Sequence, residues 1–268
     1  MTTEMLDRPE GRIAYDVTGE GPLVLLVPGM GDLRSTYRFL VPELVAAGLT
    51  AVTTDLCGHG DSDATFTSYG DVDTADDLAA LLEHLGRPAV VIGNSMAAGS
   101  AAYLAATRPE LVRGLVLLGP FVRDGDISGF QRLLLRVAMV PLWAAASWKA
   151  YAPRLYAGTK PADFEAYLPT VIASLKRPGY AASFSATTRT THAPVEARLG
   201  DVSAPTLVVM GELDPDFPAP ADEARWVADR LHAEVLMIPD AGHYPQSQRP
   251  EVVGPAVVSF VSRVATDA

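Results

Sequence analysis

The chain has 268 residues, of which 49% are hydrophobic and 20% charged, a composition that suits one large folded domain and excludes a disordered chain. Its formal net charge of −11 argues against a nucleic-acid-binding surface and against docking to anionic lipid, since both need clustered basic side chains. Cys57 is the single cysteine, so an internal disulfide and a cysteine-based zinc site are excluded.

Two segments bear on localisation. The first ten residues lack the apolar core of a secretory signal. The most apolar region, Leu133 to Trp148, is interrupted by Arg136 and Pro141 and is too short to cross a bilayer. We therefore expect a cytoplasmic protein with no membrane insertion and no nucleic-acid partner, while the sequence carries no signal for an oligomeric state.

Apolar, strand-like runs alternate with helical patterns through the first 120 residues. The predicted strands are 12–17, 23–27, 50–54, 89–93 and 115–118, and the predicted helices are 35–47, 74–85 and 96–107. Thr74 and Asp77 are spaced like a capping box at the start of the second helix. This alternation predicts an α/β fold, a mostly parallel β-sheet with helices on both faces.

The alternation stops between residues 121 and 198. Only helical pieces are predicted there, at 130–140, 142–151, 162–175 and 180–190. Strands then return at 205–210 and 234–238, with helices at 221–231 and 250–264. We therefore expect a core domain made of residues 1–120 and 199–268, and a helical cap, or lid, of residues 121–198 inserted between two strands.

Ser95 lies between an apolar strand and a helix rich in small residues. This arrangement holds a serine on a sharp strand-to-helix turn, with its hydroxyl at the top of the sheet. A serine hydroxyl is a weak nucleophile until a nearby base accepts its proton. Ser95 is therefore the candidate nucleophile, and the chain must supply a base and an acid.

His243 is the candidate base because it follows the last predicted strand, at the sheet edge where ligands bind in such folds. Asp214 follows another buried strand at the same edge and is the candidate acid that orients the imidazole. Asp216 and Asp124 are rival acids. The other histidines, 59, 84, 192 and 232, are interpreted as structural or are given no role.

The loop 28–32 follows the buried strand predicted at 23–27 and contains two glycines. Glycine lets the backbone approach a substrate closely. We expect the oxyanion hole to consist of the backbone N–H groups of Met30 in this loop and Met96 directly after Ser95.

Taken together, these motifs resemble the α/β-hydrolase family over nearly the whole chain, in its serine-nucleophile branch. The chain order Ser95, Asp214, His243 is the order of that family, and Asp55 to Ser62 is similar to its Asp-x-x-Gly-x-Gly-x-Ser turn. The sequence departs from the family at two points. Ala97 stands where glycine is usual, and Pro28 stands where relatives often carry histidine.

The resemblance and the residues together predict a serine hydrolase that cleaves a carboxylic ester or lactone through an acyl-enzyme. One alternative is a carbon–carbon bond hydrolase of a diketone-type substrate, because Gly93 to Met96 is similar to the corresponding turn of those enzymes. A receptor that retains the triad to sense a small molecule is another alternative, and a perhydrolase or haloperoxidase-type activity is a third.

The apolar side chains of the cap predict a small, moderately hydrophobic substrate. The residues predicted to bind it are Gly29, Asn94, Trp143, Trp148 and Tyr244. The two tryptophans fit either a pocket wall or ordinary packing. No metal and no other cofactor is expected: the run Asp71, Asp73, Asp76 and Asp77 is interpreted as a solvated helix start, and no glycine loop leads into a phosphate-binding lysine.

Overall fold

A computed structural model describes residues 3–125 and 128–266, and within them the strands form one eight-stranded sheet. The strands are β1 (Glu4–Arg8), β2 (Gly11–Thr18), β3 (Leu23–Val27), β4 (Thr50–Thr54), β5 (Ala89–Asn94), β6 (Val112–Leu118), β7 (Thr206–Gly211) and β8 (Glu234–Ile238). Their order is β1-β2-β4-β3-β5-β6-β7-β8. β2 pairs with β1 and β4 in antiparallel fashion, and all other neighbours are parallel.

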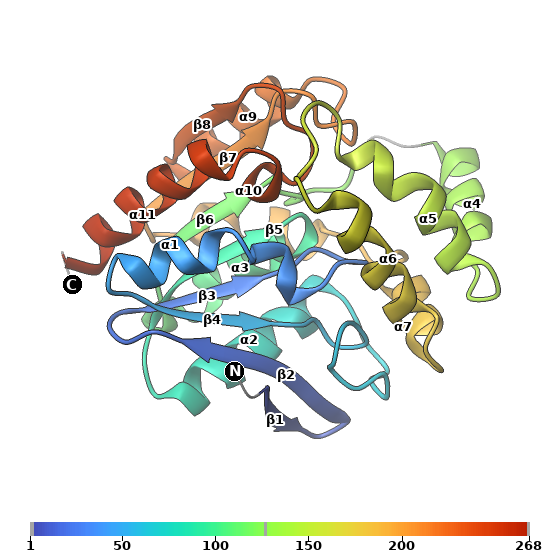
Figure 1. Cartoon of the computed structure of the whole chain (residues 1–268), viewed down its shortest axis with the longest axis horizontal. Helices are drawn as coiled ribbons and strands as arrows, with labels where there is room; N and C mark the ends of the chain where they lie inside the picture. The colour runs from blue at the N-terminus through green and yellow to red at the C-terminus, as the bar shows by residue number, and fades with distance from the viewer. Residues whose placement is uncertain (1–2, 126–127, 267–268) are drawn as a thin grey trace.

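Helices cover both faces of the sheet, which confirms the predicted fold class (Figure 1). One face packs against α1 (Leu40–Ala46) and α11 (Pro250–Thr266), and the other against α2 (Asp71–Leu85), α3 (Met96–Thr107) and α9 (Pro220–Leu231). Successive residues of a central strand alternate between the two cores: Val24 packs on the first side and Leu25 on the second. Because both faces are covered, β3, β4, β5 and β7 are buried along their whole length.

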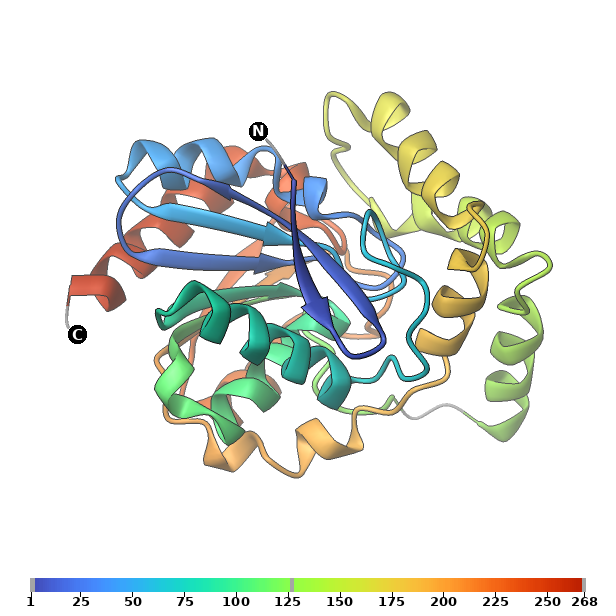
Figure 2. The same cartoon turned by 90° about the horizontal axis from the view of Figure 1, so that it is seen from below.

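Four of the helices between β6 and β7 gather at one end of the sheet (Figures 1 and 2). They are α4 (Gly129–Ala138), α5 (Ala144–Leu155), α6 (Phe164–Leu175) and α7 (Tyr180–Thr187), and we call these four helices the cap. Trp148, Tyr167 and Phe184 belong to a hydrophobic cluster of their own that also includes Tyr244 of the core. The short α8 (Ala193–Glu196) instead packs on the core through Val195.

The remaining short helices are η1 (Arg34–Tyr37), η2 (Pro109–Leu111), η3 (Leu199–Asp201) and α10 (Pro245–Gln248). Residues 126–127 of the predicted cap, and residues 1–2 and 267–268 of the predicted core, lie outside the described residues. Among the helices that the structure describes, none is long and apolar enough to cross a membrane.

The predicted helix over 35–47 is wrong, because the structure divides it into η1 and α1. Tyr37, at the end of η1, donates a hydrogen bond of 2.7 Å to the carbonyl of Val27 and is fully buried against β3. Pro42 follows in the first turn of α1, and proline is tolerated in an α-helix only near its start. A helix continuous from 35 would place this proline in its interior.

The predicted start of the next helix is also corrected. α2 begins at Asp71, and the carboxylate of Asp73 accepts a 2.9 Å hydrogen bond from the backbone N–H of Gly70. Thr74 and Asp77 therefore lie inside the helix and form no capping box. Asp71 itself is buried rather than solvated.

Candidate active site

Ser95 lies on a strained turn between β5 and α3. Its φ of 58° is in the left-handed region, which non-glycine residues rarely adopt. A Cβ on Gly93 would lie 2.4 Å from the carbonyl oxygen of Ala97, so the turn closes tightly only over a glycine. Ala97 is fully buried, and its methyl group is accommodated within the core. The strain and the close backbone approach fit a turn that presents one hydroxyl at the end of β5.

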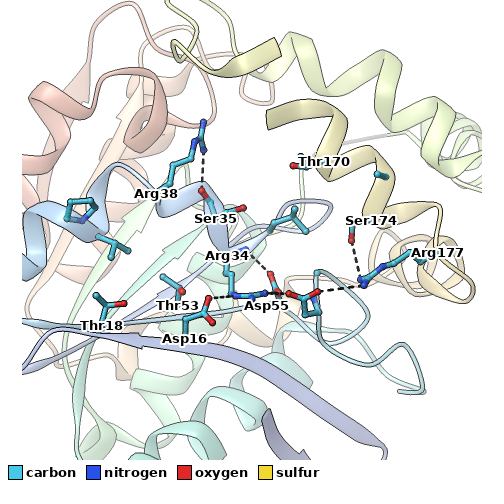
Figure 3. Close-up of a pocket in the computed structure, with 16 residues that line it drawn as sticks. Asp16, Thr18, Arg34, Ser35, Arg38, Thr53, Asp55, Thr170, Ser174 and Arg177 are labelled. Carbon is cyan, nitrogen blue, oxygen red and sulfur yellow. Dashed lines mark hydrogen bonds and ion pairs between the residues drawn. The ribbon is translucent and has the colours of Figure 1, made fainter. Parts of the chain in front are cut away.

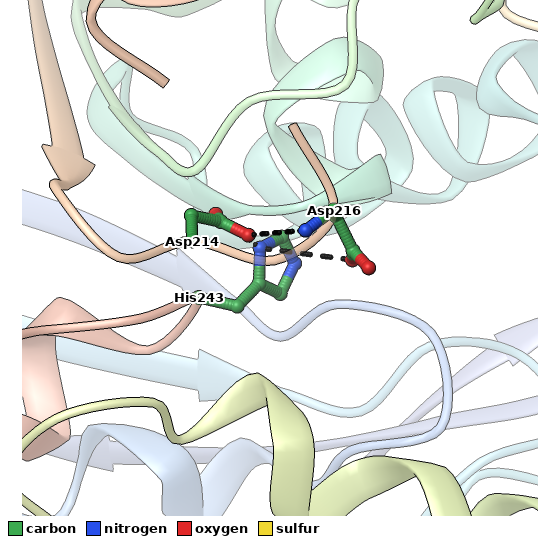
Figure 4. Close-up of side chains that lie close together, drawn as sticks. All are labelled: Asp214, Asp216 and His243. Carbon is green, nitrogen blue, oxygen red and sulfur yellow. Dashed lines mark hydrogen bonds and ion pairs between the residues drawn. The ribbon is translucent and has the colours of Figure 1, made fainter. Parts of the chain in front are cut away.

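His243 and Asp214 are joined by a hydrogen bond of 2.7 Å between Nδ1 and Oδ2, and both are buried (Figure 4). Asp214 follows β7, and His243 lies in the loop after β8. The rival Asp216 is 4.0 Å from the same nitrogen, and it accepts a hydrogen bond from Tyr151. The other rival, Asp124, accepts hydrogen bonds from Thr191 and from the backbone of His192. The geometry thus selects Asp214 as the partner of His243.

The electrostatics of this pair favour a charged imidazole. Burial opposes the positive charge, but attraction and hydrogen bonding from the Asp214 carboxylate outweigh it and raise the pKa of His243 from 6.5 to about 9. Because Asp214 occupies Nδ1, the opposite ring nitrogen, Nε2, is the one left to exchange a proton with a reactant.

A cavity of about 440 Å³ brings the expected groups together. Ser95, His243, Met30 and Met96 all line it. Within the described part of the chain no hydrogen bond joins the Ser95 hydroxyl to His243; such contacts are often loose without substrate and tighten in the complex. The backbone N–H groups of Met30 and Met96 donate a hydrogen bond to no residue that the structure describes, so both are left to bind a substrate atom.

The residues expected to bind substrate divide into two groups. Trp148 and Tyr244 line the cavity. Gly29 does not line it but lies against Ser95, since a Cβ there would be 2.8 Å from the Cβ of Ser95. Asn94 points into the protein, donating hydrogen bonds to the carbonyls of Leu118 and His243, and Trp143 is 42% exposed at the surface. The contacts of Asn94 and Trp143 do not support the predicted binding roles.

Phe121 and His192 also line this cavity, and the sequence indicated no substrate contact for either of them. The imidazole of His192 lies 2.7 Å from the buried carboxylate of Asp71. The sequence suggested no role for His192 and predicted that Asp71 is exposed to solvent. No local pattern joins residues 121 positions apart. Only the fold brings the start of α2 against the segment before α8.

Asp214, Asp216 and His243 are also the described residues whose arrangement comes nearest to a metal site, with one ligand atom of each within 4.8 Å of the others (Figure 4). The Nδ1 of His243 and a carboxylate oxygen of Asp214 are already bonded to each other. A cation bound there would have to break that hydrogen bond, so the set fits an orienting pair better than a metal centre.

A larger hollow of about 800 Å³ lies between the core and α6 (Figure 3). Most of its charged side chains pair with one another: Arg34 binds Asp16 and Asp55, and Arg177 lies 3.8 Å from Asp61. Asp55 opens the glycine turn that the sequence resemblance pointed to, and Arg34 and the backbone of Asp61 satisfy its buried carboxylate. Since Ser95 and His243 line the other cavity, this hollow is not the candidate active site.

Fold and site together define an α/β hydrolase. Residues 24–256 match the model of the alpha/beta hydrolase family, and the chain belongs to this family. It is 27% identical to 2-(acetamidomethylene)succinate hydrolase of Mesorhizobium japonicum, over 94% of this chain and 92% of that protein.

Solved structures agree with this assignment. The esterase of Thermogutta terrifontis, with malate bound, superposes with a TM-score of 0.78 at 26% identity, covering 99% of this chain and 100% of the esterase. Est816, described as an N-acyl homoserine lactone degrading enzyme, superposes with a TM-score of 0.75 at 25% identity, covering 96% of this chain and 100% of its own. The chain is thus an enzyme of the α/β-hydrolase class.

Proposed function

We propose that this protein is a serine hydrolase that cleaves a carboxylic ester or lactone of a small, moderately hydrophobic molecule. The observation that carries the proposal is the cavity that Ser95, on its strained turn, and His243, bonded to the buried Asp214, both line. Ser95 is the nucleophile, His243 the general base and Asp214 the acid that fixes the imidazole.

In the first half-reaction the Ser95 oxygen attacks the carbonyl carbon of the ester while Nε2 of His243 accepts the hydroxyl proton. The negative charge that develops on the carbonyl oxygen is stabilised by the N–H groups of Met30 and Met96. The tetrahedral intermediate collapses, the bond to the leaving oxygen breaks, and His243 returns the proton to that oxygen. Water, activated by His243, then attacks the acyl-enzyme and releases the acid and Ser95.

The apolar wall of the cavity supports the substrate class. Leu135, Met139, Trp148 and Leu155 from the cap face the cavity, and Tyr244 closes it from the core side. A volume of about 440 Å³ suits a small molecule rather than a polymer chain. The similarity to an esterase and to a lactone-degrading enzyme supports ester or lactone cleavage.

The test is hydrolysis of p-nitrophenyl esters from acetyl to dodecanoyl and of several lactones by the wild type and by Ser95→Ala. We expect turnover in the wild type that disappears in Ser95→Ala, with a chain-length optimum set by the cavity. Wild-type rates retained by a folded Ser95→Ala protein, or no hydrolysis of any of these compounds by the folded wild type, would contradict the proposal.

A matched pair of acid variants separates the two neighbouring carboxylates. Asp214→Asn should lower kcat by about 10⁴-fold, because the amide favours the wrong tautomer of His243. Asp216→Asn, two residues away, should have a much smaller effect, since its carboxylate binds Tyr151 rather than the imidazole. Equal losses in both variants would remove the basis for choosing Asp214.

A further inference from the structure

The active-site cavity contains a second histidine held by a buried acid. Nδ1 of His192 lies 2.7 Å from Oδ2 of Asp71, and the other carboxylate oxygen of Asp71 accepts a 2.9 Å hydrogen bond from Ser100. Asp71 is the first residue of α2, where the helix dipole stabilises a negative charge. An ionised carboxylate only accepts hydrogen bonds, so Nδ1 of His192 carries the proton that it donates to Asp71.

His192 is fixed from three directions in all. Besides the bond to Asp71, its backbone N–H donates a 2.8 Å hydrogen bond to Asp124, and its ring stacks on Phe121 with centroids 5.8 Å apart. Phe121 in turn contacts the ring of His243 edge-on, also at 5.8 Å, and its backbone N–H donates to the carbonyl of Ser95. The second imidazole is therefore held close to the reacting groups by one intervening aromatic ring.

One polar atom of this assembly has no role within the protein. Nε2 of His192 makes no hydrogen bond with any residue that the structure describes, and the side chain, 17% exposed, lines the cavity. The neighbouring hydroxyls of Thr187, Thr188 and Thr190 instead donate to backbone carbonyls. In a neutral imidazole whose Nδ1 bears the proton, Nε2 is a hydrogen-bond acceptor.

We propose that Nε2 of His192 accepts a hydrogen bond from an N–H or O–H group of the substrate, so that the enzyme prefers esters or lactones carrying an amide or hydroxyl over plain alkyl ones. This inference rests on the proposed ester or lactone hydrolysis and names the substrate class for the same site. Asp71 is the positioning residue, because it sets which ring nitrogen faces the cavity.

The charges around the cavity favour a donor group over an anionic one. Two further carboxylates, Asp124 and Asp216, line the same cavity. They repel a carboxylate on the substrate and attract the positive end of an N–H or O–H dipole. A neutral molecule with an apolar body and one donor group matches both this polar side and the apolar cap wall.

The experiment compares substrates that differ only in N–H against CH₂. On the acyl side these are ethyl N-acetyl-β-alaninate and ethyl 5-oxohexanoate; on the alcohol side they are 2-acetamidoethyl acetate and 4-oxopentyl acetate. The wild type, His192→Asn and His192→Gln are assayed at pH 8. His192→Asn keeps a hydrogen-bond donor toward Asp71 but loses Nε2. The amide oxygen of His192→Gln can reach the position of Nε2. His232→Asn, in the left-handed cap of α9, is the control.

For at least one of the two pairs we expect the wild type to prefer the amide by up to about tenfold in kcat/KM, because one hydrogen bond contributes about that much. The difference should appear in KM rather than in kcat. The preference should vanish in His192→Asn, return in part in His192→Gln, and persist in His232→Asn. A wild type without preference in both pairs, or a preference that survives His192→Asn, would overturn the proposal.

Calorimetric titration of the Ser95→Ala protein with the same four esters separates this inference from the proposed reaction. The amide preference in binding does not depend on turnover, so it should remain in Ser95→Ala and vanish in Ser95→Ala combined with His192→Asn. If Ser95→Ala still hydrolysed esters, the catalytic proposal would fail while the binding result still decided the role of His192. If Ser95→Ala bound the amide and the ketone equally well, the inferred substrate class would be wrong, while the proposed catalytic triad would be unaffected.

Discussion

At the scale of single residues, the chemistry depends on how burial and charge act on one imidazole. His243 is shielded from water, yet the carboxylate of Asp214 at 2.7 Å raises its pKa to about 9. In the proposed mechanism His243 must be neutral to accept the proton of Ser95, so this raised pKa would place the active form of the enzyme on the alkaline side of neutrality.

We therefore expect kcat/KM for an uncharged ester to rise with pH and to level off above about 9, following the pKa of His243. In Asp214→Asn the residual activity should follow a lower pKa, because the attraction that raises it is gone. Rate profiles between pH 5 and 10 measure this. Identical profiles for the two proteins would show that Asp214 does not set the titration of His243.

The same shift affects stability. A pKa raised from 6.5 in the unfolded chain to about 9 in the folded protein stabilises the fold while the imidazole is protonated. This contribution is fully present below about pH 6.5 and is lost as the pH rises through 9. Urea unfolding at pH 6, 7.5 and 9 should show that the free energy of unfolding falls across this range more steeply in the wild type than in His243→Gln. Parallel curves would exclude the linkage.

What the sequence could predict at this scale depended on local signals. Ser95, Asp214 and His243 each follow an apolar strand, so their shared position at one edge of the sheet could be predicted from strand boundaries alone. The contact of Asp71 with His192 could not, since it joins the first residue of a helix to a distant loop. The inward direction of Asn94 also depends on packing rather than on pattern.

At the scale of elements, the strand-to-helix turn depends on a glycine two positions before the serine. A Cβ on Gly93 would meet backbone atoms of Ala97, which cannot move without shifting α3. The methyl group of Ala97 itself is accommodated, so of these two small residues Gly93 is the one with no room for a side chain.

Gly93→Ala should therefore lower the free energy of unfolding by about 1–3 kcal/mol and reduce esterase turnover sharply, because α3 carries Met96 and its N–H away from the oxyanion. Gly200→Ala is the matched control, since a Cβ there meets nothing within 4 Å. Thermal unfolding and p-nitrophenyl acetate hydrolysis measure both effects. A Gly93→Ala protein as active and stable as Gly200→Ala would show that the turn has room.

The cap shows where sequence periodicity stops being informative. The apolar run from residue 130 to 140 predicts a helix, and α4 forms there, but most of its large apolar side chains are exposed, with Phe130 at 69% and Leu133 at 56%. Leu135, which is itself 50% exposed, and the buried Met139 line the cavity. Which side of a helix faces the core depends on how the neighbouring helices are placed, and one sequence does not contain that information.

At the scale of the whole molecule, polar contacts join the cap to the core. The guanidinium of Arg38, beside η1, binds the carboxylate of Asp163 before α6 through two hydrogen bonds of 2.6 Å and lies 4.0 Å from the ring centre of Tyr167. Tyr167 donates a 2.6 Å hydrogen bond to Asp32, and Trp148 donates one of 2.8 Å to the carbonyl of Gly31. These contacts hold α5 and α6 over the loop that supplies Met30.

Arg38→Met should loosen this attachment, because it removes the paired hydrogen bonds and the charge over the aromatic ring while keeping an apolar stem. The expected coupling between Arg38 and Asp163 in a double-mutant cycle is at most about 1 kcal/mol, since Asp163 is 40% exposed to solvent. Amide hydrogens of α6 should exchange faster, and KM for esters should rise because Trp148 and Leu155 of the neighbouring α5 line the cavity.

The pair Arg225–Asp222 on α9 is the matched control, because it is an ion pair exposed on the core and distant from the cap in sequence. Its removal by Arg225→Met should leave the exchange of α6 and KM unchanged. If Arg38→Met behaved like Arg225→Met in both measurements, the contact between Arg38 and Asp163 would not help to hold the cap on the core. If the amide hydrogens of α6 exchanged faster while KM stayed constant, the position of α5 over the cavity would not depend on α6. The contact between Arg38 and Asp163 would then stabilise the cap without affecting substrate binding.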